Sequence, residues 1–311
     1  MQKDFYHVCV AAFLATLISV PMAQAQMASP DETEIKVIAL TDNLHVLMGL
    51  GGNIAVSSGS DGVFIIDDDL KPLASKIAAA IATISDQPVK MVFNTHWHFD
   101  HSGGNEHFGE SGAVIVAHDN VRERMSTTQF SSFFGTTTKP SPDAALPVIT
   151  FGSTATFYRN GIKISAIHVA PAHTDGDAIF IFEEDNVVHL GDVYFNGMYP
   201  FIDITSGGSI LGIIAAVDQI IPMLNDETRI IPGHGPIGNL EDLRNYRSML
   251  MLVSARMQAL IDEGKTKEQA VALHPTTNFD ADWAWNFLPP DRWAGLIYDS
   301  LVESGSSVAA E

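Results

Sequence analysis

The chain has 311 residues, of which 46% are hydrophobic, and its 17 basic residues against 37 acidic ones give a formal net charge of −20. A chain of this length can form one large α/β domain or two smaller ones. The composition is that of an ordinary globular protein and excludes a disordered or collagen-like chain. Because so acidic a surface repels phosphate backbones and anionic membranes, we expect no nucleic-acid partner and no membrane association of the mature protein.

The start of the chain has the pattern of a signal peptide. Lys3 precedes a short apolar run from Val8 to Val20, and residues 23–25 read Ala-Gln-Ala, a small-residue cleavage pattern. The run is shorter than the ~20 apolar residues of a spanning helix, and a tethering helix is the alternative. We expect residues 1–25 to be removed and the protein to be secreted, into the periplasm if the cell is a diderm bacterium. The single cysteine, Cys9, lies in this leader, so a metal in the mature chain has to be held by histidine and carboxylate.

Short β-like segments separated by Gly, Asp and Asn open the mature chain. The strands expected in this part are 35–40, 44–48, 53–57 and 63–66. A helix is predicted to begin at Pro72 and to end at Ile84, and a strand follows over 89–93. A strand at 113–116 then precedes a helix over 120–125. Residues 126–147 are rich in Ser, Thr and Pro and are predicted to form a loop or flap.

The second part of the chain repeats this order, with strands first and helices after them. The strands expected here are 155–158, 162–169, 178–182, 187–190 and 230–231. An apolar run at helical spacing covers 210–224, and Asn239 with two acidic residues behind it starts a long helix. Thr266 begins a capping box for the next helix, and a proline pair opens a last helix through Val302. We expect one domain over 26–311 whose C-terminal helices begin at about residue 239.

Residues 94–101 read Asn-Thr-His-Trp-His-Phe-Asp-His and come directly after an apolar strand. His96 and His98 are two apart, so an extended chain points both imidazoles to one side, and Asp100 and His101 follow as the chain turns. Three imidazoles and a carboxylate within six residues suit a zinc ion better than a core. By chance this pattern arises in about one in a thousand chains of this length, which makes a solvated polar loop the weaker interpretation.

Three more candidate ligands each lie just past the end of a predicted strand: His173, Asp192 and His234. Ligand sites in open α/β sheets lie at the carboxyl ends of the strands. We therefore expect these side chains at one rim with the first cluster, where seven ligands would be enough for two ions that share a bridging group.

These motifs, in this order, resemble the signature motifs of the metallo-β-lactamase superfamily. The matching segments are 96–101, His173-Thr-Asp-Gly-Asp177, Gly191-Asp192 and Gly233-His234-Gly235. Gly-Gly-Asn53 and the segment 62–67 resemble the N-terminal strands of the family, so the resemblance spans the mature chain up to about residue 240. It implies an αββα sandwich, an α/β fold in which two mixed sheets are flanked by helices and the metals lie at one edge.

The resemblance also implies the ligands of two zinc ions. The first ion would be held by His96, His98 and His173. The second would be held by Asp100, His101 and His234, with Asp192 bridging both ions or serving the second. Asp100 is the expected catalytic residue, which orients the water that attacks a carbonyl carbon. The same ligand types also accept iron or manganese.

The segment after Asp192 differs from the best-known dizinc β-lactamases. Those of the B1 type carry a Cys in place of Asp192 and a Lys shortly after it, and this segment has neither. An Asp there resembles the glyoxalase II-like thioesterases and lactonases of the superfamily. Tyr194, Asn196 and Tyr199 follow Asp192 and are the candidate substrate contacts, since each could donate a hydrogen bond to a developing oxyanion.

Other residues beside the ligands have supporting parts in this interpretation. Trp97 and Phe99 alternate with the ligands and are expected to pack behind the metals. Asp175 and Asp177 follow His173, where each either orients an imidazole or is an ordinary acidic turn residue.

Seven ligands for two ions leave coordination positions for water, which favours catalysis over a closed structural site. We therefore predict an exported zinc hydrolase that acts on a small molecule with a carbonyl group. A β-lactam or similar cyclic amide ranks first, narrowly, because an exported protein meets such compounds. A lactone or ester is the close second, and glutathione thioesters rank lower because their chemistry is mostly cytosolic. An exported metal-binding protein without turnover is the non-enzymatic alternative, and no pattern in the sequence indicates an oligomeric state.

Overall fold

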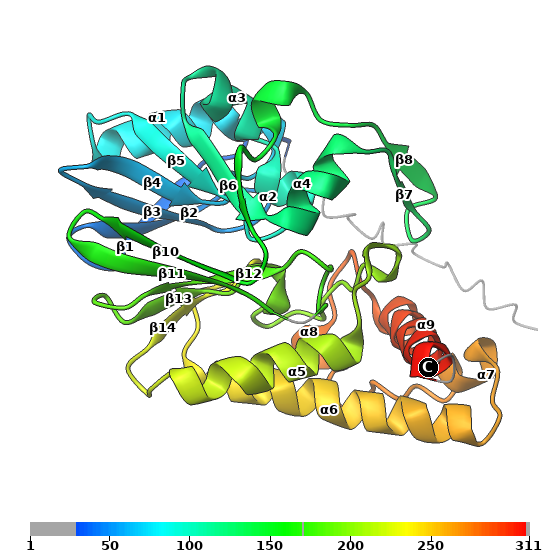
Figure 1. The fold of residues 1–311 in the computed structure, drawn as a ribbon. Coiled ribbons are helices and arrows are strands. Elements are labelled where there is room, and N and C mark those ends of the chain that lie inside the picture. The colour runs from blue at the N-terminus through cyan, green and yellow to red at the C-terminus, as the bar shows by residue number, and fades with distance from the viewer. Residues whose placement is uncertain (1–28, 170, 309–311) are drawn as a thin grey trace, which may run out of the picture.

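The computed structural model of the protein describes residues 29–169 and 171–308. Two β-sheets pack face to face, and helices cover the outer face of each sheet (Figure 1). The αββα sandwich predicted from the sequence is therefore confirmed. The predicted signal peptide of residues 1–25 and Cys9 lie outside the described residues.

The first sheet has seven strands in the order β1-β2-β3-β4-β5-β6-β9. Strands β1 to β4 are antiparallel neighbours, whereas β4, β5, β6 and β9 run parallel. The strands are β1 (Lys36–Ala39), β2 (Leu44–Met48), β3 (Ile54–Gly59), β4 (Gly62–Ile66), β5 (Val89–Phe93), β6 (Val114–His118) and β9 (Ile149–Phe151). The helices of this half are η1 (Lys71–Leu73), α1 (Ala74–Ile84), α2 (Phe99–Ser102), α3 (Asn105–Glu110), α4 (Asp119–Ser126) and η2 (Asp143–Ala145).

The second sheet has five strands in the order β10-β11-β12-β13-β14, of which only the last pair is parallel. The strands are β10 (Thr154–Arg159), β11 (Ile162–His168), β12 (Ala178–Phe182), β13 (Val187–His189) and β14 (Arg229–Ile231). The helices of this half are η3 (Gly191–Val193), η4 (Ile204–Ser206), α5 (Ile210–Ile220), η5 (Ile221–Met223), α6 (Leu240–Asp262), α7 (Lys267–Val271), α8 (Asp280–Trp283) and α9 (Pro290–Val308).

The segment 126–147, expected as a loop or flap, carries a short hairpin. Its strands β7 (Gln129–Ser131) and β8 (Thr136–Thr138) pair only with each other among the described strands. Three-residue strands with exposed threonines have no periodic apolar pattern, so the sequence gives no strand signal here. In Figure 1 the hairpin projects from the first half on the side where α7 and α9 extend from the second.

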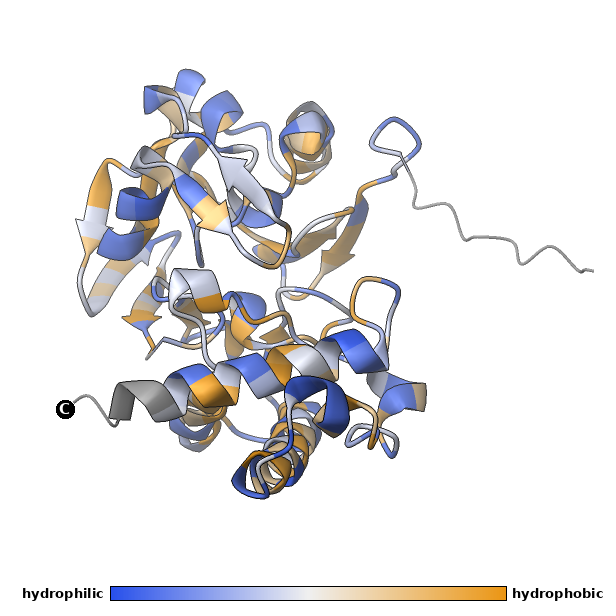
Figure 2. Ribbon diagram, turned by 90° about the vertical axis from the view of Figure 1, so that its right-hand side faces the viewer, coloured by the Kyte–Doolittle hydropathy of each residue, from blue (hydrophilic) through white to orange (hydrophobic). Residues whose placement is uncertain are grey.

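Apolar side chains fill the space between the sheets. Phe93 and Phe180 meet there with ring centroids 5.6 Å apart. Strand β12 reads Ala-Ile-Phe-Ile-Phe without alternation because both of its faces are covered, one by the other sheet and one by helices. Burying each such large side chain contributes about 1.5–3 kcal/mol. The apolar sides of α5, α6 and α9 form a second core on the outer face of the sheet, and Figure 2 shows α9 with hydrophobic and hydrophilic residues interspersed.

The helix starts follow the predicted capping chemistry. The Asn239 side chain accepts hydrogen bonds from the backbone N–H groups of Glu241 and Asp242, and Asp242 returns the contact to the backbone of Asn239. Thr266 and Gln269 form the same reciprocal arrangement at the start of α7. Both capping residues were assigned to helix starts from the sequence, and both assignments are confirmed.

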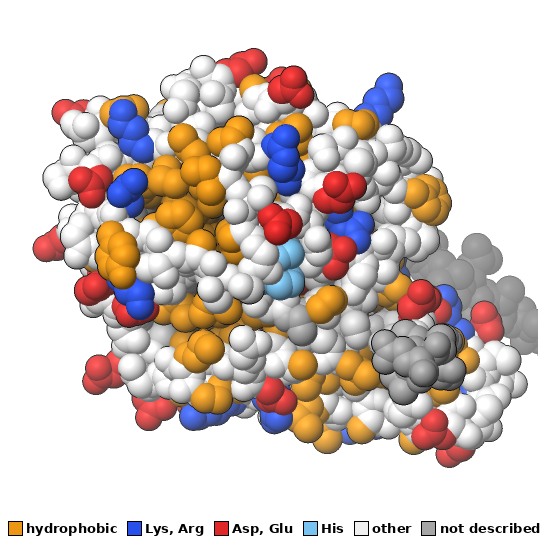
Figure 3. Space-filling model, viewed as in Figure 1, with side chains coloured by type: hydrophobic (Ala, Val, Ile, Leu, Met, Phe, Trp, Pro, Cys, Tyr) orange, Lys and Arg blue, Asp and Glu red, His pale blue; other side chains and the backbone are white. Residues whose placement is uncertain are grey.

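The surface reflects the acidic composition. On the face shown in Figure 3, acidic side chains are spread around the molecule and basic side chains are interspersed with them. Within residues 29–169 and 171–308, no helix has the length and apolar character needed to cross a bilayer.

Candidate metal centre

The seven predicted ligands lie together, in the segments that follow β5, β11, β13 and β14, with Asp100 and His101 on the short helix α2 and Asp192 on η3. Their ligand atoms form two groups, and the atoms of each group lie within 4.8 Å of one another. The first group is His96, His98, His173 and Asp192, and the second is Asp100, His101 and His234. Four strands far apart in the sequence thus deliver nitrogen and oxygen donors to one place.

Asp192 faces both groups with its two carboxylate oxygens. Oδ2 lies 3.4 Å from His173 Nε2 and 3.8 Å from His96 Nε2. Oδ1 lies 3.0 Å from His101 Nε2 and 3.5 Å from His234 Nε2. The carboxylate therefore spans the centre, in the position that a ligand shared by two ions requires.

Hydrogen bonds away from the centre fix which nitrogen of each imidazole in the first group carries its proton. His173 Nδ1 lies 2.8 Å from the carbonyl oxygen of Phe201, which only accepts, so Nδ1 is the donor. His98 Nε2 donates to Asp203 Oδ2 at 2.9 Å for the same reason. The inward atoms His173 Nε2 and His98 Nδ1 then both present lone pairs, 2.8 Å apart.

The hydrogen-bond partners of His96 and His101 likewise show which ring nitrogen carries the proton. Thr95 Oγ1 donates to Asp67 Oδ2 at 2.8 Å, so it accepts from His96 Nδ1 at 3.0 Å. His101 Nδ1 donates to Asp67 Oδ2 at 2.7 Å. In neutral His96 and His101 the Nε2 atoms are thus lone pairs that point into the centre.

Nitrogen and oxygen lone pairs that converge with no hydrogen-bond donor between them are stabilised by a bound cation. His96 Nε2 and Asp192 Oδ1 are buried and have no hydrogen-bond partner among the described residues. An unsatisfied buried polar atom costs about 1–3 kcal/mol, and a bound metal ion satisfies several at once. Imidazole and carboxylate donors without thiolate suit zinc, and they also suit iron and manganese. The residues therefore fit a divalent metal site.

The pKa shifts of four of the ligand histidines also fit a metal site. Burial lowers the pKa of His96 and lowers that of His173 to about 4, which keeps both imidazoles neutral and able to bind metal. Burial opposes protonation of His101 and His234 too, but Asp192 and the neighbouring carboxylates outweigh it. They raise the pKa of His234 to about 9, and they also raise the pKa of His101 well above its ordinary value. The second group thus attracts positive charge, which either protons or a metal ion can supply.

Two supporting carboxylates have no signal in the histidine pattern. Asp203 lies in a coil far along the chain from His98, and its side chain also accepts from Thr205 Oγ1 and Ser206 Oγ at 2.6 Å. Asp67 directly follows β4, so the rule of ligands at strand ends could have found it. It adopts a positive φ of 63°, which Asp tolerates better than most residues.

Asp175 and Asp177, the two acidic residues after His173, make different contacts. Asp177 Oδ2 accepts from the backbone N–H groups of His173 and Thr174 at 2.6 and 2.9 Å, which shapes the ligand loop, and burial raises its pKa to about 7. Asp175 instead forms a two-pronged ion pair with Arg124 at 2.6 Å. Asp177 thus positions the ligand backbone, and Asp175 ties the loop to α4.

Two of the three expected substrate contacts after Asp192 are buried in the structure. Tyr194 and Tyr199 are fully buried, and the Tyr199 hydroxyl donates to Asp280 Oδ1 at 2.8 Å. The Asn196 amide donates to the carbonyl oxygen of Pro236. Tyr194 packs against Tyr246 of α6 and Tyr199 against Trp293 of α9, so both support the centre from beneath, whereas Asn196 is half-buried. The expectation for Phe99 was also wrong, since 65% of its surface is exposed.

Two glycines allow this close packing. Gly191, just before Asp192, adopts a positive φ of 50°, which disfavours a side chain. At Gly233 an added Cβ would overlap Asp192 Oδ1. Backbone without side chains thus lets the shared carboxylate sit directly against the loop that carries His234.

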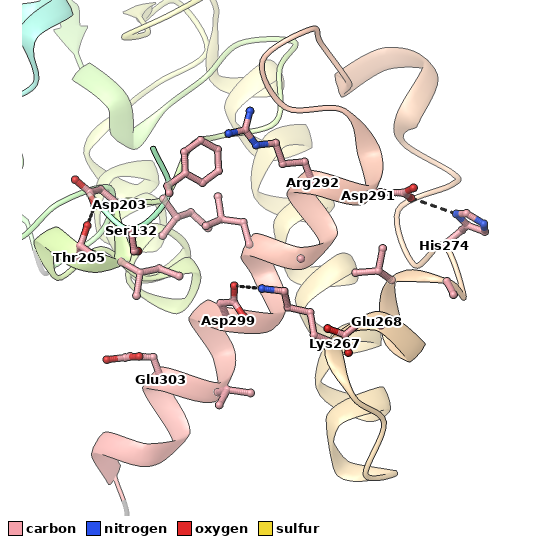
Figure 4. A pocket seen from close by; sticks show the side chains of 18 residues that line it. Ser132, Asp203, Thr205, Lys267, Glu268, His274, Asp291, Arg292, Asp299 and Glu303 are labelled. Carbon is pink, nitrogen blue, oxygen red and sulfur yellow. Dashed lines mark hydrogen bonds and ion pairs between the residues drawn. The ribbon is translucent and has the colours of Figure 1, made fainter. Parts of the chain in front are cut away.

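Two cavities flank the hairpin β7–β8. One of about 560 Å³ lies toward α2–α4 and includes His98 and Asp203 in its wall. The other, of about 1050 Å³, lies toward α7 and α9, with Asp203 at one end (Figure 4). Phe133 of the hairpin packs on Phe201 at 4.7 Å, and the Arg292 guanidinium of α9 lies 4.0 Å from the Phe133 ring. This contact holds the hairpin against the C-terminal helices.

The sandwich thus carries converging imidazole and carboxylate ligand atoms just past the ends of four of its strands. Residues 55–265 match the family model of the metallo-beta-lactamase superfamily. The chain belongs to this superfamily.

Curated relatives and solved structures agree with the assignment. The chain is 26% identical over 172 residues to a hydroxyacylglutathione hydrolase from Nitrosococcus oceani, covering 55% of this chain and 57% of the relative. It is 27% identical over 191 residues to one from Dictyostelium discoideum, covering 60% of this chain and 63% of that protein. The chain thus spans less than two thirds of the length of these relatives.

Two solved structures share the fold. A metallo-beta-lactamase from Pontibacter korlensis aligns with a TM-score of 0.57 at 19% identity, over 70% of this chain and 99% of that one. The sec-alkylsulfatase Pisa1 from Pseudomonas sp. aligns with a TM-score of 0.67 at 14% identity, over 85% of this chain and 50% of that one. At these identities the likeness concerns the fold alone.

Proposed function

We propose that the protein is an exported, dinuclear zinc hydrolase that cleaves an ester, lactone or thioester bond of a small molecule. The single observation that carries the proposal is the placement of Asp192, whose two oxygens face the two ligand groups. A ligand shared in this way supports two ions rather than one. A closed structural site would need only four donors.

The choice of substrate departs from the order given by the sequence. A cyclic amide ranked first there, narrowly. The relatives found by sequence are hydroxyacylglutathione hydrolases, whose name denotes a thioester substrate, and this chain has Asp192 where B1 β-lactamases have Cys. These two facts favour an acyl–oxygen or acyl–sulfur bond. A β-lactam becomes the second candidate, and the hydrolase class is unchanged.

When bound, two zinc ions would lower the pKa of water and polarise the substrate carbonyl. His96, His98 and His173 would hold one ion, Asp100, His101 and His234 the other, and Asp192 both. Although burial disfavours its charge, His101 and His234 keep the pKa of Asp100 below its ordinary value, so its carboxylate is ionised and can accept a hydrogen bond from the attacking water. The Asp100 side chain is 25% exposed, which puts this acceptor on the side that solvent and substrate reach.

The test is a hydrolysis panel on purified, zinc-loaded mature protein. It contains an acyl-glutathione thioester, a γ-lactone, a 4-nitrophenyl ester and a chromogenic cephalosporin, each with and without a chelator. Chelator-sensitive turnover that is fastest on the thioester, lactone or ester supports the proposal. Fastest turnover of the cephalosporin restores the cyclic amide to first place. A two-metal protein inert on all four compounds would favour a binding role without turnover.

A further inference from the structure

The smaller cavity borders the metal centre at one ligand candidate, His98. It measures about 560 Å³ and lies between the hairpin β7–β8 and helices α2–α4. The metal-ligand candidate His98 and its neighbour Phe99 both form part of its wall. Pockets of roughly 300–1,000 Å³ hold small-molecule ligands. An occupant of this cavity would therefore lie beside the first ligand group.

Aromatic side chains line this cavity with unusual exposure. Phe99 is 65% exposed, and Phe134 of the hairpin is 46% exposed. Trp97 and Met125 continue the apolar lining. Exposed aromatic surface beside a reactive centre offers stacking and burial to an apolar or aromatic group of a substrate.

The cavity is also more basic than the protein around it. Its wall contains three basic residues, Lys71, Arg124 and Lys139, against two acidic ones, Glu106 and Asp203. Lys71 pairs with Glu106, and Arg124 pairs with Asp175. In the part of the chain that the structure describes, Lys139 has no ion pair. In a chain of net charge −20, the wall of this cavity thus carries one cation without an ion pair among the described residues, Lys139, while the Asp203 carboxylate in the same wall accepts from His98, Thr205 and Ser206.

The larger cavity has the opposite charge. Figure 4 shows its lining, in which two basic residues, Lys267 and Arg292, face five acidic ones: Asp203, Glu268, Asp291, Asp299 and Glu303. Lys267 is neutralised by Asp299 at 2.6 Å. Of the two cavities beside the hairpin, an anionic group is therefore favoured only in the smaller one.

We propose that the smaller cavity is the specificity pocket of the metal centre. It seats an apolar, preferably aromatic group of the substrate on Phe99 and Phe134, and Lys139 pairs with an anionic group at the far end of that substrate. The substrate class is thus an ester, thioester or lactone that combines an aromatic or other apolar body with a carboxylate or similar anion. This assignment rests on the proposed function for the reaction, whereas the binding it describes is independent of turnover.

Binding is tested with naphthalene-2-sulfonate, an aromatic anion that binds metals weakly, and its neutral methyl sulfone, both followed by fluorescence titration. Lys139→Ala weakens binding of the sulfonate by about fivefold and leaves the sulfone unchanged. Phe134→Ala weakens both by about tenfold. The controls are Lys36→Ala, which removes an equal charge from exposed strand β1, and Phe130→Ala, which removes the other exposed aromatic ring of the hairpin. Both controls bind as wild type.

Turnover separates the pocket from the reaction. The substrates are mono-(4-nitrophenyl) terephthalate and 4-nitrophenyl 4-methylbenzoate, which differ by one carboxylate. Wild type prefers the terephthalate by its KM, and Lys139→Ala removes that preference without changing kcat. If the protein cleaves neither ester but the variants show the expected binding pattern, the proposed function is refuted and the assignment of the pocket stands. If Lys139→Ala matches wild type in both assays, or Lys36→Ala has the same effect, the pocket is refuted. The exposed Lys139 keeps the test decisive even if Phe134→Ala loosens the hairpin.

Discussion

The two ligand groups of the metal centre differ in exposure and in charge. In the first, the side chains of His96 and His173 are 1% and 0% exposed, and burial keeps both imidazoles neutral. In the second, His234 and Asp100 are 16% and 25% exposed, and carboxylates raise the pKa of the imidazole to about 9. If the centre binds two ions, we expect the enclosed neutral His96 and His173 to hold one of them firmly, and the more exposed His234 and Asp100 to let water and substrate approach the other. We call these the holding side and the reacting side; His98, 12% exposed, and the fully buried His101 do not follow the division.

Removing the shared ligand should erase this difference and have the largest effect. Asp192→Ala removes the carboxylate that faces both groups, so we expect metal content to fall from about two ions per chain to one or fewer. We also expect kcat/KM to fall by more than about 10³-fold, equivalent to about 4 kcal/mol of lost transition-state stabilisation. Elemental analysis and kinetics measure both. Asp226→Ala, whose side chain is 91% exposed, is the control and keeps both values. Full metal content in Asp192→Ala would show that the carboxylate is not shared.

Asp100→Ala should affect the reacting side alone. The variant loses a carboxylate of the second group and the acceptor for the attacking water, and we expect turnover to fall by about 10²–10³-fold. The first group keeps all its donors, so one ion per chain remains. Steady-state kinetics and metal analysis of the same sample check this. Wild-type activity in this variant would remove Asp100 from the mechanism.

The two supporting carboxylates provide a smaller, matched test. Asp67→Asn leaves His101 without its anionic acceptor, and Asp203→Asn does the same to His98. Each should weaken metal binding or activity by about 10–100-fold. Asp67 also accepts from Thr95 Oγ1, which contacts His96, so Asp67→Asn should weaken the second-group step of a zinc titration and, to a smaller extent, the first. Asp203→Asn should weaken the first-group step alone. A second-group step weakened by Asp203→Asn would show that the two groups do not act separately.

Graded metal removal should give the smallest shift. A ligand present at about a thousand times its Kd stabilises the folded state by about 4 kcal/mol, which corresponds to about 10 °C in Tm for a chain of this size. As chelator is added, we expect activity to disappear first, with the ion of the reacting side. Most of the Tm increment should persist until the ion of the holding side leaves. Parallel loss of activity and Tm at every chelator concentration contradicts this order.

Local pattern and the strand-end rule account for the ligand candidates. His173, Asp192 and His234 each follow an apolar strand, and such strands are defined by residues close in sequence. Local patterns do not show which residues are buried by segments that lie far away in the sequence. Tyr194 looked available to a substrate because it follows Asp192, but α6 covers it, with Tyr246 at a ring distance of 5.1 Å. The covering helix lies some fifty residues further along the chain.

The supporting groups show the same limit. Asp203 has no distinctive neighbours in sequence, and its role appears only when the fold brings it 2.9 Å from His98. The hairpin β7–β8 has short exposed strands, and its position depends on Phe133 packing on Phe201 and under Arg292. Sequence periodicity records which face of an element is apolar, but not which remote element covers it.

The contact between Arg292 and the hairpin lies outside the part of the chain that carries the ligand candidates. Residues 55–265 match the superfamily and carry all seven ligand candidates, whereas Arg292 lies beyond them on the last helix. The Arg292 guanidinium covers the Phe133 ring and Phe201 packs on it too, so both help to hold the hairpin that lies between the two cavities. If the smaller cavity is the specificity pocket, a change in α9 would alter which molecules it accepts and leave the seven ligand candidates in place, so a new preference could arise in a segment that carries none of them.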